Sequence, residues 1–216
     1  MAQRLRQAER KQRTRGELVS TARTVFLERG FHGASLDEIA ERAGYSKGAV
    51  YSNFAGKDDL FLAVLDAQFE QRVRVLTDVA LDENRLEDSY RAVARSIVAA
   101  DRAEPRWTPL LLEFWAHASR RDSLRAAVAE RRERFFNVIA GLIDELGSRH
   151  GVEFAIPAKE VARGSNALAR GIALDWLLAP TSVSAELFEE MHTAFVTGLT
   201  RAPAAAEPAG KEPTVP

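Results

Sequence analysis

The 216-residue sequence contains no cysteine, which excludes disulfide bonds, thiolate catalysis and cysteine-ligated metal sites. A chain without disulfides fits a reducing compartment. No apolar run approaches the ~20 residues that a membrane-spanning helix needs. The charged N-terminus also lacks the apolar segment of a signal peptide. We therefore expect a soluble cytoplasmic protein with no membrane partner.

Catalytic motifs are missing as well. The chain has four histidines, and none of them lies in a recognisable nucleophile, metal or cofactor motif. There is no glycine-rich phosphate loop either. Glu113 and His117 have the four-residue spacing of a metal-binding pair, but no third ligand is evident, and a pair of surface side chains is the favoured interpretation. We expect no catalytic residue, no metal and no cofactor, and keep an enzyme as the less favoured alternative.

Charge is distributed unevenly along the chain, although the formal net charge is only −1. Residues 1–15 carry six basic side chains against Glu9, so this arm has a charge of +5 and the other 201 residues carry −6. A basic arm on an acidic body indicates a local anionic partner, but a solvated tail explains the arm equally well. We expect residues 1–14 to form a disordered arm.

Apolar residues between positions 15 and 201 recur with the 3.6-residue period of a helix, which predicts an all-α protein of about nine helices. The segment 15–56 contains three short helices, and a linking helix follows at about 57–80. Residues 81–201 form a second domain of longer helices. Within it we expect helices at about 86–103, from a Thr108 cap and Pro109 onward, at 123–146 with a stop at Gly147, at 158–179 and at 185–201. Residues 202–216 are rich in Pro and Ala, which predicts a disordered tail.

The helix ends in the first segment have clear signals. Gly30 follows the apolar stripe of the first helix, where a helix would stop. Ser35 with Glu38 three residues later has the spacing of a capping box and starts the second helix. Gly44 ends that helix, and Ser46 can cap the third. Two short helices joined through "AGYS" match the helix-turn-helix pattern, although an ordinary surface turn between two core helices fits the same spacing.

The third helix, in "SKGAVYSNF", has two different sides. Val50 and Phe54 are one turn apart and face the small core. The opposite side carries Lys47, Gly48, Tyr51 and Ser52. Small residues allow a close approach to DNA, and a lysine supplies charge for phosphate or a guanine edge. This side of the helix is therefore a candidate nucleic-acid contact.

From about Arg13 to Phe69 the sequence resembles the N-terminal domain of the TetR family of one-component transcriptional repressors. The resemblance rests on "TARTVFLERGFHGASLDEIAERAGYSKGAVYSNFAGKDDLFLAVL". It implies a homodimer that sets two recognition helices into successive major grooves of a pseudo-palindromic double-stranded DNA operator. By position, it assigns base or near-base contacts to Tyr45, Lys47, Gly48, Ala49 and Ser52, and phosphate contacts to Ser35, Ser46, Tyr51, Asn53 and Lys57. Whether the basic arm also contacts DNA stays open.

Two positions depart from the pattern of the family. Asn53 stands where such proteins often carry His, and Gly56 stands where Ser is common. Asparagine still binds phosphate or base edges but cannot become charged, so we expect no pH-sensitive contact at this position.

The resemblance also implies that the C-terminal helices bind a small-molecule effector. Aromatic side chains are concentrated there, and such clusters belong either to the core or to the wall of a ligand cavity. Asp175 either orients a cationic or hydroxylated ligand or is simply exposed. The candidate ligand-binding residues are Trp107, Leu111, Phe114, Trp115, Phe135, Phe136, Asp175 and Trp176.

The last two predicted helices have broad apolar surfaces, and Gly164 and Gly171 lie inside the first of them, where glycine costs about 1 kcal/mol relative to alanine. We interpret this pair as one half of a four-helix homodimer interface over about 158–201. The sequence thus predicts a ligand-responsive DNA-binding transcriptional regulator, with a repressor released from a palindromic operator favoured over an activator. The main alternative is a helical ligand-binding or scaffold protein without specific DNA binding.

Overall fold

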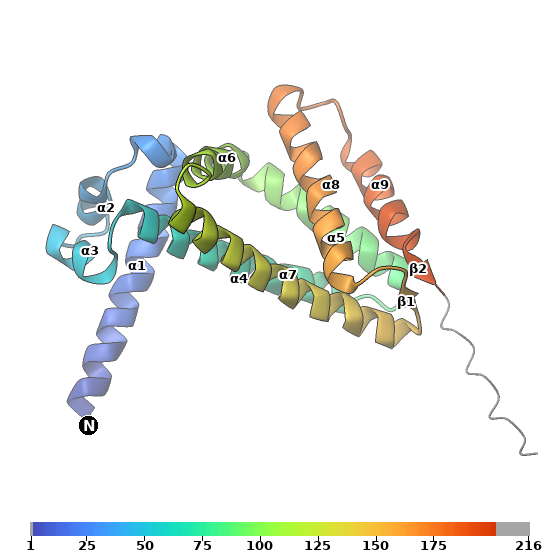
Figure 1. Ribbon diagram of the computed structural model, residues 1–216, viewed down its shortest axis with the longest axis horizontal. Coiled ribbons are helices and arrows are strands. Elements are labelled where there is room, and N and C mark those ends of the chain that lie inside the picture. Colours follow the sequence, from blue (N-terminus) through green and yellow to red (C-terminus); the bar gives the residue numbers. More distant parts are fainter. Residues whose placement is uncertain (1, 202–216) are drawn as a thin grey trace, which may run out of the picture.

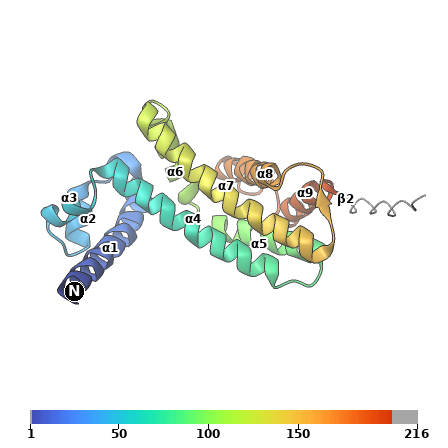
Figure 2. The same cartoon turned by 60° about the horizontal axis from the view of Figure 1, so that its bottom comes forward.

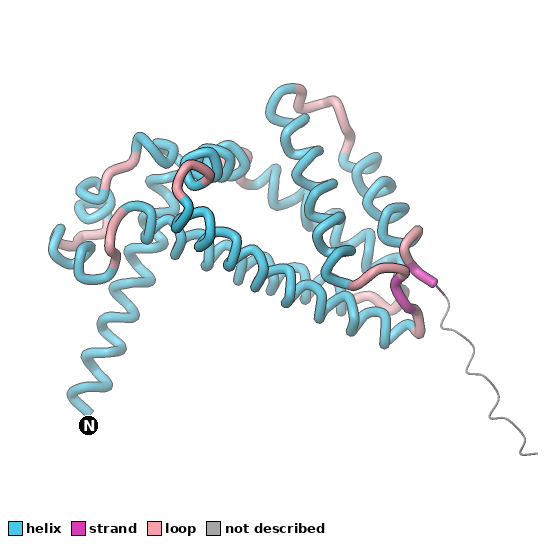
Figure 3. The backbone as a smooth tube through the Cα atoms, in the orientation of Figure 1, coloured by secondary structure: helices cyan, strands magenta, loops and turns pink. Residues whose placement is uncertain are grey.

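The computed structural model describes residues 2–201, which form nine α-helices and two short strands (Figure 1). Figure 3 shows how little of this part of the chain is not helical. The predicted all-α fold is therefore confirmed. The elements are α1 (Ala2–Gly33), α2 (Leu36–Arg42), α3 (Lys47–Asn53), α4 (Lys57–Leu81), α5 (Leu86–Ala103), α6 (Trp107–Ala118), α7 (Asp122–His150), β1 (Glu153–Phe154), α8 (Ala158–Leu178), α9 (Ala185–Thr197) and β2 (Thr200–Arg201).

Helices α1 to α3 gather at one end of the molecule, and α4 runs from them into the bundle formed by α5 and α7 to α9 (Figures 1 and 2). Apolar side chains at helical spacing form the core of this N-terminal unit. The fully buried members include Leu18, Phe26, Ile39, Val50 and Phe54. Because α4 belongs to both parts, it connects the small N-terminal core to the bundle.

The structure corrects the expectation of a disordered arm at residues 1–14. From Ala2 onward the chain is helical and continuous with the rest of α1. Charge alone favoured disorder, but this stretch consists largely of Ala, Arg, Gln, Glu, Lys and Leu, which are strong helix formers. Arg13 also forms an ion pair with Glu17 one turn later, with 2.9 Å between Nε and Oε1. The predicted tail at 202–216 lies outside the described residues.

The predicted caps of α2 and α3 are confirmed. The hydroxyl of Ser35 accepts a hydrogen bond from the backbone N–H of Glu38 at 3.1 Å, and Ser46 accepts one from Ala49 at 3.2 Å. The carboxylate of Glu38 does not complete the capping box, because it forms an ion pair with Arg42 at 2.7 Å instead. One N-terminal cap hydrogen bond therefore fixes the start of each of these two helices.

Several boundaries in the second half differ from the prediction. Helix α6 begins at Trp107, so Thr108 is its second residue rather than its cap, and the Thr108 hydroxyl donates to Asp101 at 3.3 Å. Helix α7 passes Gly147 and ends at His150, and its C-cap Gly151 has a left-handed φ of 63°. A Cβ at Gly147 would lie 2.9 Å from the carbonyl oxygen of Val152, so this glycine permits a close backbone approach.

The predicted end of the last helix, at residue 201, is also wrong. Helix α9 ends at Thr197, and β2 pairs antiparallel with β1, with Phe154 opposite Thr200. Two-residue strands carry too little alternation for a sequence pattern to detect. None of the helices within residues 2–201 is long and apolar enough to cross a membrane.

Helix α6 joins the bundle to the bend in α1. At Gly30 the backbone leaves the helical conformation, with φ 73° and ψ 171°, which is the stop that the sequence predicts. One more helical turn follows, to Gly33. The carboxylate of Glu113 accepts the backbone N–H groups of Phe31 at 2.9 Å and of His32 at 2.8 Å. His117 Nε2 lies 3.0 Å from Asp58 Oδ1. Glu113 and His117 therefore each contact the N-terminal unit rather than forming the expected surface pair.

We expect Gly30→Ala to destabilise the protein by about 1–3 kcal/mol. Its left-handed φ strains any residue with a side chain, and a Cβ there would lie 2.7 Å from the Glu113 carboxylate. Urea unfolding measures the loss. Gly16→Ala is the matched control, because Gly16 is helical with open space around it and should gain up to about 1 kcal/mol. Equal stability of the two variants would contradict this account of the bend.

Candidate functional site

The exposed side of α3 carries the residues that the sequence assigned to it. Val50 and Phe54 are 0% and 1% exposed and anchor the helix in the core. Lys47, Gly48 and Ser52 are exposed on the other side, and 59% of Tyr51 is open to solvent. The two-sided character predicted for this helix is therefore present in the fold. We call Lys47, Gly48, Tyr51 and Ser52 the α3 face.

Packing within the chain does not require a residue as small as glycine on the α3 face. A Cβ added at Gly48 would meet only the Ser46 hydroxyl, at the ordinary distance of 3.8 Å. Glycine in a helix interior costs about 1 kcal/mol relative to alanine, which is an upper limit for Gly48 in the first turn of α3. Neither the conformation nor the neighbours of Gly48 explain that cost, so an external surface is the better explanation. Lys47 forms an exposed ion pair with Asp37.

The remaining candidates around α3 are Ser35, Ser46, Tyr45, Ala49, Asn53 and Lys57. Ser35 and Ser46 are exposed and the other four are half-buried. Asn53 Nδ2 donates to the carbonyl oxygen of Ala49 at 2.8 Å, and the Tyr45 hydroxyl donates to Glu17. These side chains thus have structural partners as well as exposed atoms.

Lys57 also has internal partners. Its ammonium group donates to the backbone carbonyls of His32 at 3.2 Å and Ala34 at 3.0 Å, and it lies over the Phe31 ring, 4.8 Å from the centroid. Arg15 similarly donates to the carbonyl oxygen of Asn53 at 2.7 Å and stacks on Phe54. Both cations hold the N-terminal unit together at its exposed edge. A substitution of Lys57 would therefore disturb the fold together with any contact outside the chain.

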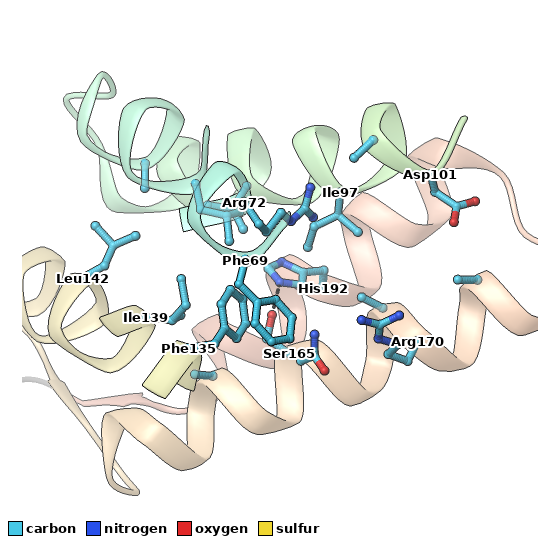
Figure 4. A pocket seen from close by; sticks show the side chains of 18 of the residues that line it. Phe69, Arg72, Ile97, Asp101, Phe135, Ile139, Leu142, Ser165, Arg170 and His192 are labelled. Carbon is cyan, nitrogen blue, oxygen red and sulfur yellow. Dashed lines mark hydrogen bonds between the residues drawn. The ribbon is translucent and has the colours of Figure 1, made fainter. Parts of the chain in front are cut away.

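The second feature is a cavity of about 210 Å³ in the bundle, lined by residues of α4 to α9 (Figure 4). Apolar side chains dominate its walls. Three of the eight candidate ligand-binding residues, Trp107, Phe135 and Trp176, line this cavity.

The other five candidates lie elsewhere, which corrects their assignment to a cavity wall. Leu111 and Phe114 are fully buried in close-packed core, where aromatic rings surround Phe114. Trp115 contacts Arg132 and Arg170, and Phe136 is buried with Arg132 and Arg163 over its ring. Asp175 is exposed. Helical spacing is the same for core and cavity residues, so the sequence pattern did not separate them.

Sequence reasoning missed the polar side chains of the cavity. Arg72 of α4 and Arg170 of α8 both line it, as do Tyr90, Ser165 and His192. Figure 4 shows Arg170 and Asp101 toward one end, Ile139 and Leu142 toward the other, and Arg72 between them. An arginine within the apolar stretch "NALARGIAL" is the signal that could have indicated this site.

Burial shifts the ionisation of these groups. Desolvation, with smaller contributions from the cations Arg132 and Arg72, lowers the pKa of Arg170 to about 10. Burial likewise raises the pKa of Asp101 and lowers the pKa of His192 to about 4. His192 is therefore neutral at pH 7, and its Nε2 lies 2.6 Å from the Ser165 hydroxyl. Within residues 2–201 no group of three or more His, Asp or Glu side chains is arranged to hold a metal ion.

A helix-turn-helix with an open recognition face, joined by a shared helix to a hollow helical bundle, defines a DNA-binding regulator with a sensor domain. Residues 18–64 match the family model of bacterial regulatory proteins of the tetR family. Residues 86–201 match the C-terminal model of BetI-type transcriptional repressors, which covers more than half of the chain. The chain belongs to the TetR family of transcriptional regulators, whose members are typically ligand-responsive DNA-binding proteins.

Three known proteins illustrate the similarity. The transcriptional activator FasR of Mycolicibacterium smegmatis is 48% identical over 59 residues, which are 27% of this chain and 27% of FasR. The repressor BepR of Brucella suis biovar 1 is 31% identical over 134 residues, 62% of this chain and 57% of BepR. A TetR-family regulator from Mesorhizobium loti MAFF303099 shares the fold, with a TM-score of 0.71 and 24% identity over 88% of this chain and 96% of that one.

The matched regions span only about a quarter of FasR and somewhat more than half of BepR. These relatives are transcriptional regulators, and none is named as an enzyme or a scaffold protein.

We expect acid to destabilise the protein through His192. Its pKa falls from 6.5 to about 4 on folding, so between these values the unfolded chain binds more protons than the folded one. The resulting stability is present above pH 6.5 and lost as the pH falls through 4, at most about 3 kcal/mol in all. Urea unfolding from about pH 7 to about pH 4.5 should show a shallower loss in His192→Gln than in the wild type.

His150→Gln controls for the substitution itself, because His150 does not line the cavity. It should keep the wild-type dependence on pH. The same slope in His192→Gln would mean that His192 does not carry the effect.

Proposed function

We propose that this protein is a repressor that binds a palindromic operator as a homodimer and is released by a small-molecule effector in the cavity of the bundle. The observation that carries the proposal is the α3 face, where Gly48 has no internal packing role although Val50 and Phe54 fix the helix firmly from behind. A helix that is held rigidly from one side and carries a glycine on its exposed side can approach the major groove of DNA closely.

In this proposal Lys47, Gly48 and Ser52, with Tyr45 and Ala49 beside them, approach the base edges. Ser35, Ser46, Tyr51, Asn53 and Lys57 meet phosphates on either side. Lys57 and Asn53 already donate hydrogen bonds within the chain, so their contribution comes mainly from where they lie beside the phosphates. Few long polar side chains are available for base readout, so phosphates and shape supply much of the affinity.

Two helices would transmit effector binding to the DNA-binding unit. Helix α4 contributes Phe69 and Arg72 to the cavity and also Leu60 and Phe61 to the N-terminal core. Helix α6 contributes Trp107 to the cavity and Glu113 to the bend of α1. An effector that favours one position of these helices shifts the spacing of the two recognition helices away from the ~34–36 Å between half-sites.

The α8–α9 pair is the proposed homodimer surface. Leu174, Leu177, Leu178, Leu187 and Met191 are large apolar residues left exposed on these two helices. Apolar side chains gathered on adjacent helices are typical of subunit interfaces.

The two glycines of α8 differ in their surroundings. A Cβ at Gly164 would lie 2.4 Å from the Phe195 ring of α9, so this glycine serves the packing of α8 on α9 within one chain. Gly171 has open space around it, which is compatible with the approach of a second subunit.

The experiment that tests the function is selection of genomic DNA fragments by the purified protein, followed by fluorescence anisotropy on the selected site. A saturable complex with a palindromic site, strongly weakened by salt, is expected. Retention of no specific fragment would reject the proposal.

We expect Gly48→Ala to weaken operator binding about tenfold, because the new methyl group separates the helix backbone from DNA at a cost of about 1.4 kcal/mol. Its unfolding stability should stay equal or rise by up to about 1 kcal/mol. Lys47→Ala should also weaken binding by about tenfold, because it removes a charged hydrogen bond to a base edge. Anisotropy titrations at several salt concentrations measure both effects.

Gly141→Ala is the matched control, because Gly141 is an exposed helical glycine of α7 with open space around it. It should bind the operator like the wild type. Wild-type affinity in both Gly48→Ala and Lys47→Ala would remove the α3 face from the proposal.

We expect Leu178→Glu to weaken the homodimer at least tenfold without unfolding the subunit, since 90% of Leu178 is exposed and a buried unpaired charge is costly at an interface. Sedimentation equilibrium at micromolar concentration measures the association. Val138→Glu, an exposed apolar site on α7 with 52% exposure, should leave it unchanged. A monomeric wild type would contradict the proposed interface.

A further inference from the structure

The cavity has a charge that its own walls do not balance. Arg72 and Arg170 line it, and Arg132 lies over the same Trp115 ring as Arg170. Asp101 is the carboxylate among the lining residues that faces Arg170, and it accepts a hydrogen bond from Thr108. The other lining carboxylate, Glu104, forms an ion pair with Arg23 of α1. Among the described residues, the lining cations Arg72 and Arg170 therefore outnumber Asp101, the one lining carboxylate without an ion pair.

The guanidinium of Arg170 has contacts with aromatic faces but unused donors. Its Cζ atom lies 5.0 Å from the centroid of the Trp115 ring, whose other neighbour is Arg132 at 4.9 Å. Stacking satisfies the flat faces of a guanidinium and leaves its N–H groups available. Within residues 2–201 no group accepts a hydrogen bond from Arg170, while Arg72 donates one, to the carbonyl oxygen of Ser96 at 3.3 Å.

The opposite end of the cavity is apolar. Leu76, Ala80, Ile139, Leu142 and Leu146 line it, and Phe69 and Phe135 stack on each other between the two ends, with 4.9 Å between ring centroids. Figure 4 shows this spatial order along the cavity, from Leu142 and Ile139, past Phe69 and Phe135, to Arg170. An occupant that is apolar over most of its length and anionic at one end matches this lining.

The size of the cavity limits the occupant. One water needs ~10–15 Å³ of such space, so about 210 Å³ has room for roughly 14–21 water-sized groups. This range fits a fatty acid or a ring system of similar size. A whole nucleotide conjugate such as an acyl coenzyme A does not fit inside this volume.

From this arrangement we propose that the effector is an amphiphilic carboxylate, held by its carboxylate on Arg170 and Arg72 with its apolar chain extending toward Leu142. The inference rests on the proposed function for its regulatory meaning, but the binding itself is independent of DNA. A planar guanidinium binds a carboxylate through two parallel hydrogen bonds, which a neutral or cationic head group does not offer. Burial is the main cause of the lowered pKa of Arg170, and Arg132 and Arg72 lower it further, while Asp101 opposes the shift.

Intrinsic tryptophan fluorescence reports binding, because Trp107 and Trp176 line the cavity. The probes are laurate, the neutral alcohol dodecanol and the cation dodecyltrimethylammonium, which share one alkyl chain. Laurate should bind at least tenfold more tightly than dodecanol, and the cation most weakly. Equal affinity for laurate and dodecanol would overturn the proposal. Lauroyl coenzyme A binding more tightly than laurate would overturn the assignment of a free carboxylate.

The residue assignment has its own test. Arg170→Gln and Arg72→Gln should each bind laurate roughly ten to a hundred times more weakly, as expected for a lost charged hydrogen bond. Dodecanol affinity should be nearly unchanged, which also shows that the variant cavity is folded. Arg74→Gln is the matched control, because Arg74 is an exposed arginine of α4 outside the cavity, and it should bind laurate normally. A loss of dodecanol affinity equal to that of laurate would contradict a head-group role.

Parallel anisotropy on the selected operator separates this inference from the proposed function. Laurate should dissociate the operator complex of the wild type, and about tenfold or more laurate should be needed for Arg170→Gln. A protein that binds its operator but no amphiphilic carboxylate would refute the inference alone. A protein that binds laurate but no DNA fragment would refute the repressor and leave the ligand assignment standing.

Discussion

The contact between Glu113 and the bend of α1 determines how the two parts of the molecule are oriented. One carboxylate accepts two adjacent backbone N–H groups, of Phe31 and His32, that the break at Gly30 leaves without helical partners. The Phe31 ring packs against Phe61 of α4 and Phe114 of α6, so polar and aromatic contacts meet at the same place. A small shift of α6 therefore changes the direction of α1 and of the recognition helix packed on it.

Helix α6 also extends to the cavity, which gives the proposed effector a short physical connection to that bend. Arg170 stacks on Trp115, and Trp115 lies two residues after Glu113 in the same helix. A carboxylate on Arg170 would compete for the position of the guanidinium and so bias the position of Trp115. Packed interfaces have discrete arrangements, so such a bias selects between states rather than bending one state continuously.

Local signals were sufficient to predict α2, α3 and the break in α1, although they missed the helical start of α1. The caps at Ser35 and Ser46 and the break at Gly30 follow from short-range backbone chemistry. The charged cavity end was not predictable in this way, because arginine on a helix usually extends into solvent. Arg72 and Arg170 are 98 residues apart in sequence and line one cavity only through the packing of the bundle. For the same reason the aromatic pattern placed Phe114 in a ligand site although it belongs to the core.

Stability alone does not explain the composition of the cavity. A close-packed bundle gains free energy by filling such a space with apolar side chains, and a half-buried cation without an acceptor loses hydration that no partner replaces. Replacing buried charged groups by apolar ones of similar volume is often neutral or stabilising. Arg170, unlike Arg72, has no such acceptor among the described residues, so it costs the bundle more stability than an apolar residue of similar volume would. An anion that binds Arg170 recovers this free energy only in the bound state, which is the differential affinity that a ligand needs in order to shift a conformational equilibrium.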